Sequence, residues 1–60
     1  MYMHVIIMNK NSMETLDVKN VKSIEKYSTE NFRITYEEDG AEKTIERSAK
    51  WYSIYILGID

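Results

Sequence analysis

Hydrophobic and polar residues alternate along most of this chain with a period of two, which is typical of β-strands that bury one face. The longest alternation, over residues 32 to 47, is interrupted once, at Asp39-Gly40. Asp and Gly tolerate the positive φ angles of a two-residue type I′ turn, so this dipeptide predicts a β-hairpin. With these two residues at the tip, Ile34 faces Ile45. The predicted apolar face consists of Phe32, Ile34, Tyr36 and Ile45.

The opposite face of this hairpin is polar and acidic toward its tip. The same register pairs Arg33 with Glu46, Thr35 with Thr44, and Glu37 with Glu42. Carboxylates near a turn can hold Mg²⁺ or Ca²⁺, but neighbouring strand residues point to opposite faces. We therefore interpret the tip as solvated, with no metal, and as a candidate acidic contact for a basic partner. Its residues are Glu37, Glu38, Asp39 and Glu42.

The rest of the chain also divides into short extended segments. Strands are expected at residues 2–8, 13–18, 21–28 and 52–57, with turns at residues 9–12 and 19–20. A three-residue loop at 29–31 would place Ile24 opposite Tyr36. Residues 48–51 interrupt the alternation and predict one short helical turn, capped by Ser48.

The first and last predicted strands are apolar on both faces, unlike the others. Pairing them with each other would bury both and close the sheet. The sequence therefore predicts an all-β fold over residues 1–60: a single small antiparallel barrel of five or six short strands. This layout, with its single turn before the last strand, resembles the SH3-like small barrels.

A barrel takes only one face of each strand into its interior, so the terminal strands would keep an apolar outer row. Such rows usually mark contact surfaces, and Tyr, Trp and Met are enriched in interfaces. The alternation does not decide which parity faces inward. The candidate partner or homo-oligomer interface comprises Tyr2, Met3, Val5, Ile7, Trp51, Tyr52, Tyr55 and Leu57.

Composition narrows the possible functions. The net charge is −2 and there is no cysteine, which excludes disulfides and thiolate metal sites. The only histidine, His4, has no partner or substrate pocket that the sequence can name, so we expect no catalytic site and no cofactor. We also expect a cytoplasmic protein, because the N-terminal run lacks a basic segment and is too short to span a bilayer.

The chain is also similar in composition to the very short, Asn-, Lys-, Ile- and Tyr-rich proteins of phages that infect AT-rich bacteria. Many of those proteins are stoichiometric inhibitors of host enzymes or of bacterial immunity, including anti-CRISPR proteins. This resemblance implies a non-catalytic inhibitor that occupies a functional surface of a host defence enzyme, inside the bacterial host cell. A host regulatory module remains an alternative. A second alternative is a small barrel that binds single-stranded nucleic acid through its aromatic rings and Lys22, Lys26, Arg33, Arg47 and Lys50.

Overall fold

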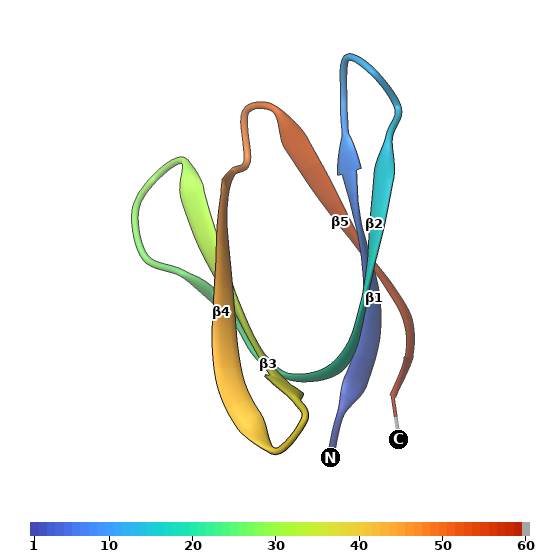
Figure 1. Cartoon of the computed structure of the whole chain (residues 1–60). Helices are drawn as coiled ribbons and strands as arrows, with labels where there is room; N and C mark the ends of the chain where they lie inside the picture. Colours follow the sequence, from blue (N-terminus) through green and yellow to red (C-terminus); the bar gives the residue numbers. More distant parts are fainter. Residues whose placement is uncertain (60) are drawn as a thin grey trace.

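The computed structural model describes residues 1–59 and contains one antiparallel sheet of five strands (Figure 1). The strands are β1 (Met3–Asn9), β2 (Thr15–Lys26), β3 (Asn31–Glu38), β4 (Ala41–Ser48) and β5 (Tyr52–Ile59). Their order in the sheet is β4-β3-β2-β1-β5. The all-β, antiparallel prediction is confirmed, with five strands.

The β3–β4 hairpin has the register that its sequence predicts. Asp39 and Gly40 have φ angles of 53° and 78°, as the two-residue turn requires. Ile34 faces Ile45, and Arg33 faces Glu46. Local alternation and the turn residues are therefore sufficient to define this half of the sheet.

Strand β2 is longer than predicted and bends in the middle. The prediction of two separate strands at residues 13–18 and 21–28, with a turn between them, is wrong. One strand of 12 residues runs through this region. Its register shifts against β1 between Val18 and Val21, and against β3 between Val21 and Ser23. Asn20 lies in this bulge with φ of 58°, and bulges increase the bend of a strand.

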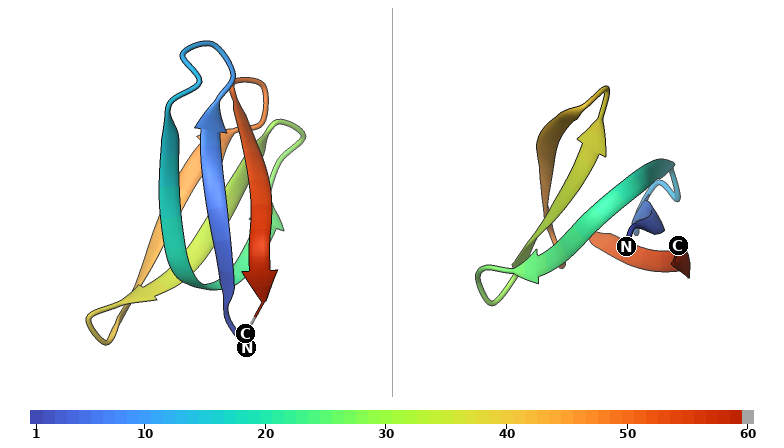
Figure 2. Two further views of the ribbon diagram at one scale, coloured as in Figure 1. Left: turned by 90° about the vertical axis from the view of Figure 1, so that its right-hand side faces the viewer. Right: turned by 90° about the horizontal axis from the view of Figure 1, so that it is seen from below.

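The bend in β2 folds the sheet over itself into two layers (Figure 2). The second half of β2 belongs with β3 and β4, and the first half belongs with β1 and β5. Val21 packs where the layers meet and is 0% exposed. The buried core on the inner faces comprises Val5, Ile7, Val18, Val21, Phe32 and Ile34.

The sheet is open, so the predicted closed barrel is wrong. β1 pairs with β5, as expected for two largely apolar strands. However, β4 and β5 are the two ends of the strand order and do not pair with each other. A barrel would need that last pair of strands to exchange main-chain hydrogen bonds, and here both remain edges.

The helical turn predicted before the last strand is absent. Residues 49–51 form a turn in which the Trp51 N–H donates to the Ser48 carbonyl at 3.2 Å. The Ser48 hydroxyl accepts a hydrogen bond from the Lys50 N–H at 3.2 Å, so the predicted cap exists without a helix. On the neighbouring strand pair, Ile24 faces Ile34 instead of Tyr36. The predicted loop at residues 29–31 is one residue too late, because the Tyr27 N–H donates to the Asn31 carbonyl and residues 28–30 form the loop.

Candidate functional site

The two edges of the sheet differ sharply in chemistry. Edge strand β4 carries both signs of charge, from Glu42, Lys43, Glu46 and Arg47. Edge strand β5 has the sequence YSIYILGI and carries no charge over its whole length. Natural sheets usually protect exposed edges with charged residues, Pro or bulges. β5 has neither charge nor Pro, and a register shift near its end is its one feature of this kind, so it is the less protected edge.

Large apolar side chains are exposed along the second half of β5. The exposed fractions are 49% for Tyr55, 54% for Ile56, 55% for Leu57 and 61% for Ile59. We call these four residues the β5 patch. Contiguous exposed apolar groups of this kind mark contact surfaces more often than chance.

Pairing with β1 explains how the β5 patch reaches both faces of the sheet. Ile56 is opposite the core residue Val5 and points to the inner face. Tyr55 is opposite Ile6 and points to the outer face. The register shifts between His4 and Val5, which leaves Leu57 as the additional residue of a bulge. The second half of β5 runs away from the β3–β4 hairpin (Figure 1), so Ile56 stays exposed although it is on the inner face.

The turn before β5 adds aromatic and basic groups beside this edge. The Lys50 ammonium lies 5.3 Å from the centre of the Trp51 ring. The Arg47 guanidinium lies 5.5 Å from the centre of the Tyr52 ring. Both distances are within the range of cation–π attraction. The N–H of Lys10 donates to the Trp51 carbonyl at 2.8 Å, which ties the turn to the β1–β2 loop.

The predicted interface is only partly at the surface. Val5 and Ile7 are 0% and 2% exposed, so their assignment to an outer row is wrong: their parity faces the core. Met3 and Tyr52 pack half-buried against the same core. Tyr2 is half-buried too. Trp51, at 47% exposed, and two members of the β5 patch, Tyr55 and Leu57, remain accessible.

Sequence reasoning missed two residues of the β5 patch, Ile56 and Ile59. Alternation alone assigns Ile56 to the same face as core residues, because it faces Val5 across the strand pair. Its exposure results from the open edge, and openness is a property of the whole sheet. No local signal in residues 52–59 could have revealed it.

The acidic tip is largely paired within the chain. The Lys22 ammonium lies 3.5 Å from a Glu37 carboxylate oxygen and 3.2 Å from one of Glu42. The hydrogen bond to Glu42 raises the pKa of Lys22 above its ordinary value. Lys43 lies 2.8 Å from Glu38, and that carboxylate raises the pKa of Lys43. Lys22 thus offsets the like-charge pair that the hairpin register creates.

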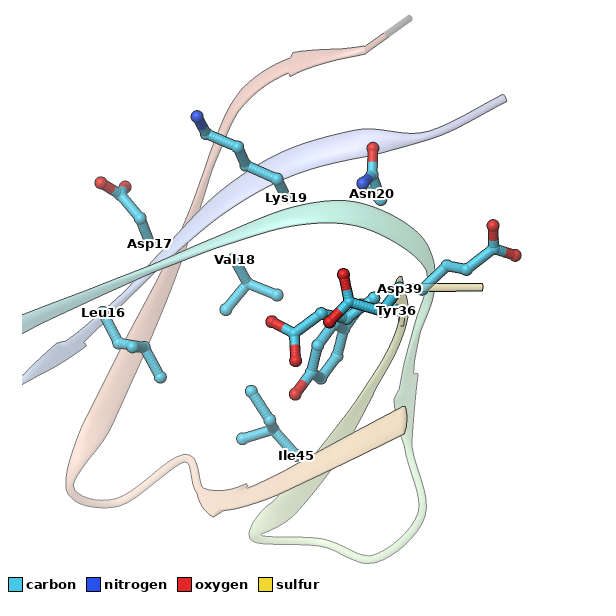
Figure 3. A pocket seen from close by; sticks show the side chains of 10 residues that line it. Leu16, Asp17, Val18, Lys19, Asn20, Tyr36, Asp39 and Ile45 are labelled. Carbon is cyan, nitrogen blue, oxygen red and sulfur yellow. The ribbon is translucent and has the colours of Figure 1, made fainter. Parts of the chain in front are cut away.

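A shallow groove lies between the first half of β2 and the β3–β4 hairpin (Figure 3), with a volume of about 440 Å³. Apolar side chains from three strands line its floor, and acidic residues lie at its rim. The floor consists of Leu16, Val18, Tyr36 and Ile45, and the acidic rim consists of Asp17, Glu37, Glu38 and Asp39. Lys22 and Lys43 already pair with Glu37 and Glu38, so half of the rim carboxylates have a lysine partner within the chain.

His4 has a carboxylate neighbour, which the sequence did not identify. Its Nε2 lies 3.4 Å from Asp17 Oδ1, but the geometry does not form a hydrogen bond. The contact becomes an ion pair when the ring is protonated. Within residues 1–59 no group of three His, Cys, Asp or Glu side chains could hold a metal ion.

No protein-family model, curated protein or solved structure gives a significant match to this chain. Residues 1–59 contain no helix that is long and apolar enough to cross a membrane.

Proposed function

We propose that this chain is a non-catalytic protein-binding module whose contact surface is the β5 patch with the adjoining Trp51. The observation that carries the proposal is the uncharged edge strand with four large apolar side chains about half exposed. An extended segment of another protein can add to such an edge, using main-chain hydrogen bonds for affinity and side-chain contacts for specificity.

Burial of the β5 patch would contribute favourable free energy to the binding of a partner. Covering the exposed half of each of these four side chains contributes about 1 kcal/mol per residue. Main-chain hydrogen bonds along the strand add to this, whereas the loss of translational and rotational freedom opposes it. Trp51 extends the surface with a residue type that often dominates interface energetics.

At its most specific, the proposal is a phage-type inhibitor that blocks a host defence enzyme by occupying a functional surface. The resemblance in composition to small phage proteins and the exposed edge support it. The fold is proposed to be an open relative of the SH3-like barrels, which the strongly bent second strand supports. A host regulatory module would use the same surface, and the genomic neighbourhood of the gene would separate the two.

The test compares the wild-type chain with two lysine variants as baits in a bacterial lysate. Ile56→Lys places a charge in the β5 patch, whereas Thr44→Lys places the same charge on the exposed β4 edge. We expect a protein, identified by mass spectrometry, that wild type and Thr44→Lys retain and Ile56→Lys loses. Its purified form should bind the wild-type chain at least tenfold more tightly than Ile56→Lys.

Two results would overturn this function. One is equal retention of every captured protein by Ile56→Lys, shown to be folded by circular dichroism. The other is turnover of nucleic acids or nucleotides by the purified chain alone, which a non-catalytic module does not perform.

A second candidate function is binding of single-stranded nucleic acid. It is favoured by the cation–π pairs Lys50–Trp51 and Arg47–Tyr52, because aromatic rings stack on bases and nearby cations contact phosphates. Fluorescence anisotropy with a labelled oligonucleotide would separate the candidates. Phosphate contacts are strongest at low salt, so the absence of binding there would eliminate this alternative. Binding that Trp51→Ala abolishes would favour it over the protein-binding module.

A further inference from the structure

The chain protects one edge of its sheet with charges and leaves the other, apart from the bulge at Leu57, available for pairing. β4 presents charges of both signs, whereas the sequence of β5 contains no charged residue and no Pro. A free edge has unpaired main-chain N–H and C=O groups that can template another strand. The chemistry of β5 therefore constrains what can lie beside it.

The strand that matches β5 best is uncharged and apolar on both faces. Ile56 would need an apolar neighbour on the inner face, and Tyr55 would need one on the outer face. Among the strands of residues 1–59, only β1 and β5 are largely apolar on both faces, and β1 is already paired on both sides, by β2 and β5. The matching strand with a free edge is thus β5 itself, supplied by a second copy.

We propose that β5 pairs antiparallel with β5 of a second copy, about a two-fold axis at Tyr55, to form a continuous ten-stranded sheet from two five-stranded sheets. This inference rests on the proposed function in one respect: the dimer covers the β5 patch, so dimerisation regulates the binding of a protein partner there. A protein partner has to compete with the second copy for β5.

The side-chain faces restrict the register to pairs centred on a single residue, and we place the centre at Tyr55 because it lies in the middle of β5. In a two-fold antiparallel pair, residues on one face of the sheet must meet residues on the same face. Centring the pair on Tyr55 sets Tyr55 against Tyr55, and Ile54 against Ile56 of the second copy. Because residues 52–59 carry no charge, this register brings no like charges together.

The interface is small, so the dimer is expected to dissociate on dilution. Each copy contributes one strand of eight residues, which corresponds to the low end of specific interfaces, below roughly 1,200 Å² in total. We therefore expect dissociation at micromolar rather than nanomolar concentrations. Static light scattering of the wild-type chain over a dilution series should pass from dimer to monomer.

Opposite charges at position 55 provide the sharpest test. Because Tyr55 faces its own copy across the axis, Tyr55→Lys and Tyr55→Glu should each weaken the homodimer severalfold, through loss of the Tyr–Tyr pair and through like-charge repulsion. An equimolar mixture should recover a heterodimer. Thr44→Lys, on the opposite edge, should dimerise like wild type, and circular dichroism establishes that each variant is folded.

A cysteine test does not depend on charge. The chain has no cysteine, so Tyr55→Cys can form a disulfide only between copies. Facing residues in antiparallel strands lie about 4.5–5.5 Å apart between Cα atoms, within the range of a disulfide. Mild oxidation should cross-link Tyr55→Cys and leave Thr44→Cys monomeric.

The failures of the two proposals are distinguishable. A wild-type chain that stays monomeric at millimolar concentration, a charge mixture that does not associate, or preferential cross-linking of Thr44→Cys would each overturn the dimer. If the wild-type chain is monomeric yet still captures a partner that Ile56→Lys loses, the dimer is refuted and the protein-binding function stands. A dimer that competes with no captured protein supports self-pairing and argues against the binding function.

Discussion

Met13 provides the most direct test of local strain in this fold. It lies in the loop between β1 and β2 with φ of 66°, and its N–H donates to the Asn9 carbonyl at 2.8 Å. A residue with a Cβ pays about 1–2 kcal/mol for the left-handed conformation. Glycine avoids that cost but loses about 0.5–1 kcal/mol more backbone entropy on folding. Because the Met13 side chain is 62% exposed, its removal sacrifices little packing.

Met13→Gly should therefore stabilise the chain by about 0.5–1 kcal/mol, the difference between these two effects. For a domain of this size, each 1 kcal/mol shifts the melting temperature by roughly 4–8 °C. Thermal unfolding followed by circular dichroism measures the shift. Met13→Val is the matched control, because a β-branched residue fits positive φ poorly and should melt below wild type. A lower melting temperature for Met13→Gly, or a Met13→Val variant as stable as wild type, would show that the loop is not strained at this residue.

The remaining predictions concern the core, the tip of the hairpin and the bend. Ile34 is 0% exposed, so Ile34→Ala should cost about 2–5 kcal/mol, a large part of the roughly 3–9 kcal/mol expected for a chain of this length. Leu16→Ala, at a side chain 44% exposed, should cost clearly less in urea unfolding, and equal costs would contradict the assignment of the core. The pKa of Lys22 is raised above 10.5, so its stabilising effect is complete below that pH and is lost as pH rises through the higher folded value. Lys22→Met should lower stability at neutral pH and lack this alkaline decrease, and parallel curves for the two proteins in urea unfolding would contradict the pairing. Asn20→Val should lower the free energy of unfolding by about 1–2 kcal/mol, because φ is 58° at this position. Asn20→Gly should leave the stability close to that of the wild type. Equal melting temperatures for the two variants would argue against the bulge.

The β3–β4 hairpin could be predicted because its determinants are local. Asp39-Gly40 fixes the turn, and each partner in the ladder then follows by counting outward, as the pairing of Ile34 with Ile45 shows. The cost of the Glu37–Glu42 pair was also evident from the sequence. The pairing of both carboxylates with Lys22 was not evident, because Lys22 comes from a different strand.

The bend in β2 could not be predicted from local signals. Asn20 favours a left-handed conformation in a turn and in a bulge alike, so the sequence is equally compatible with a chain reversal. The difference depends on whether Val18 and Val21 both continue to pair with β1. They do so opposite Val5 and Met3, and such long-range pairing leaves no trace in the residues around the bend.

The apolar character of the terminal strands has two separate causes, which the sequence pattern cannot distinguish. β1 lies between β2 and β5, and neighbours on both sides cover its outer residues Ile6 and Met8 enough to leave them half-buried. β5 has no such neighbour on its free side, and an edge of a stable sheet is normally charged. The fold therefore accounts for the composition of β1 but leaves that of the β5 patch unexplained. The proposed pairing of β5 with another strand would supply the reason for this surface that the fold itself does not.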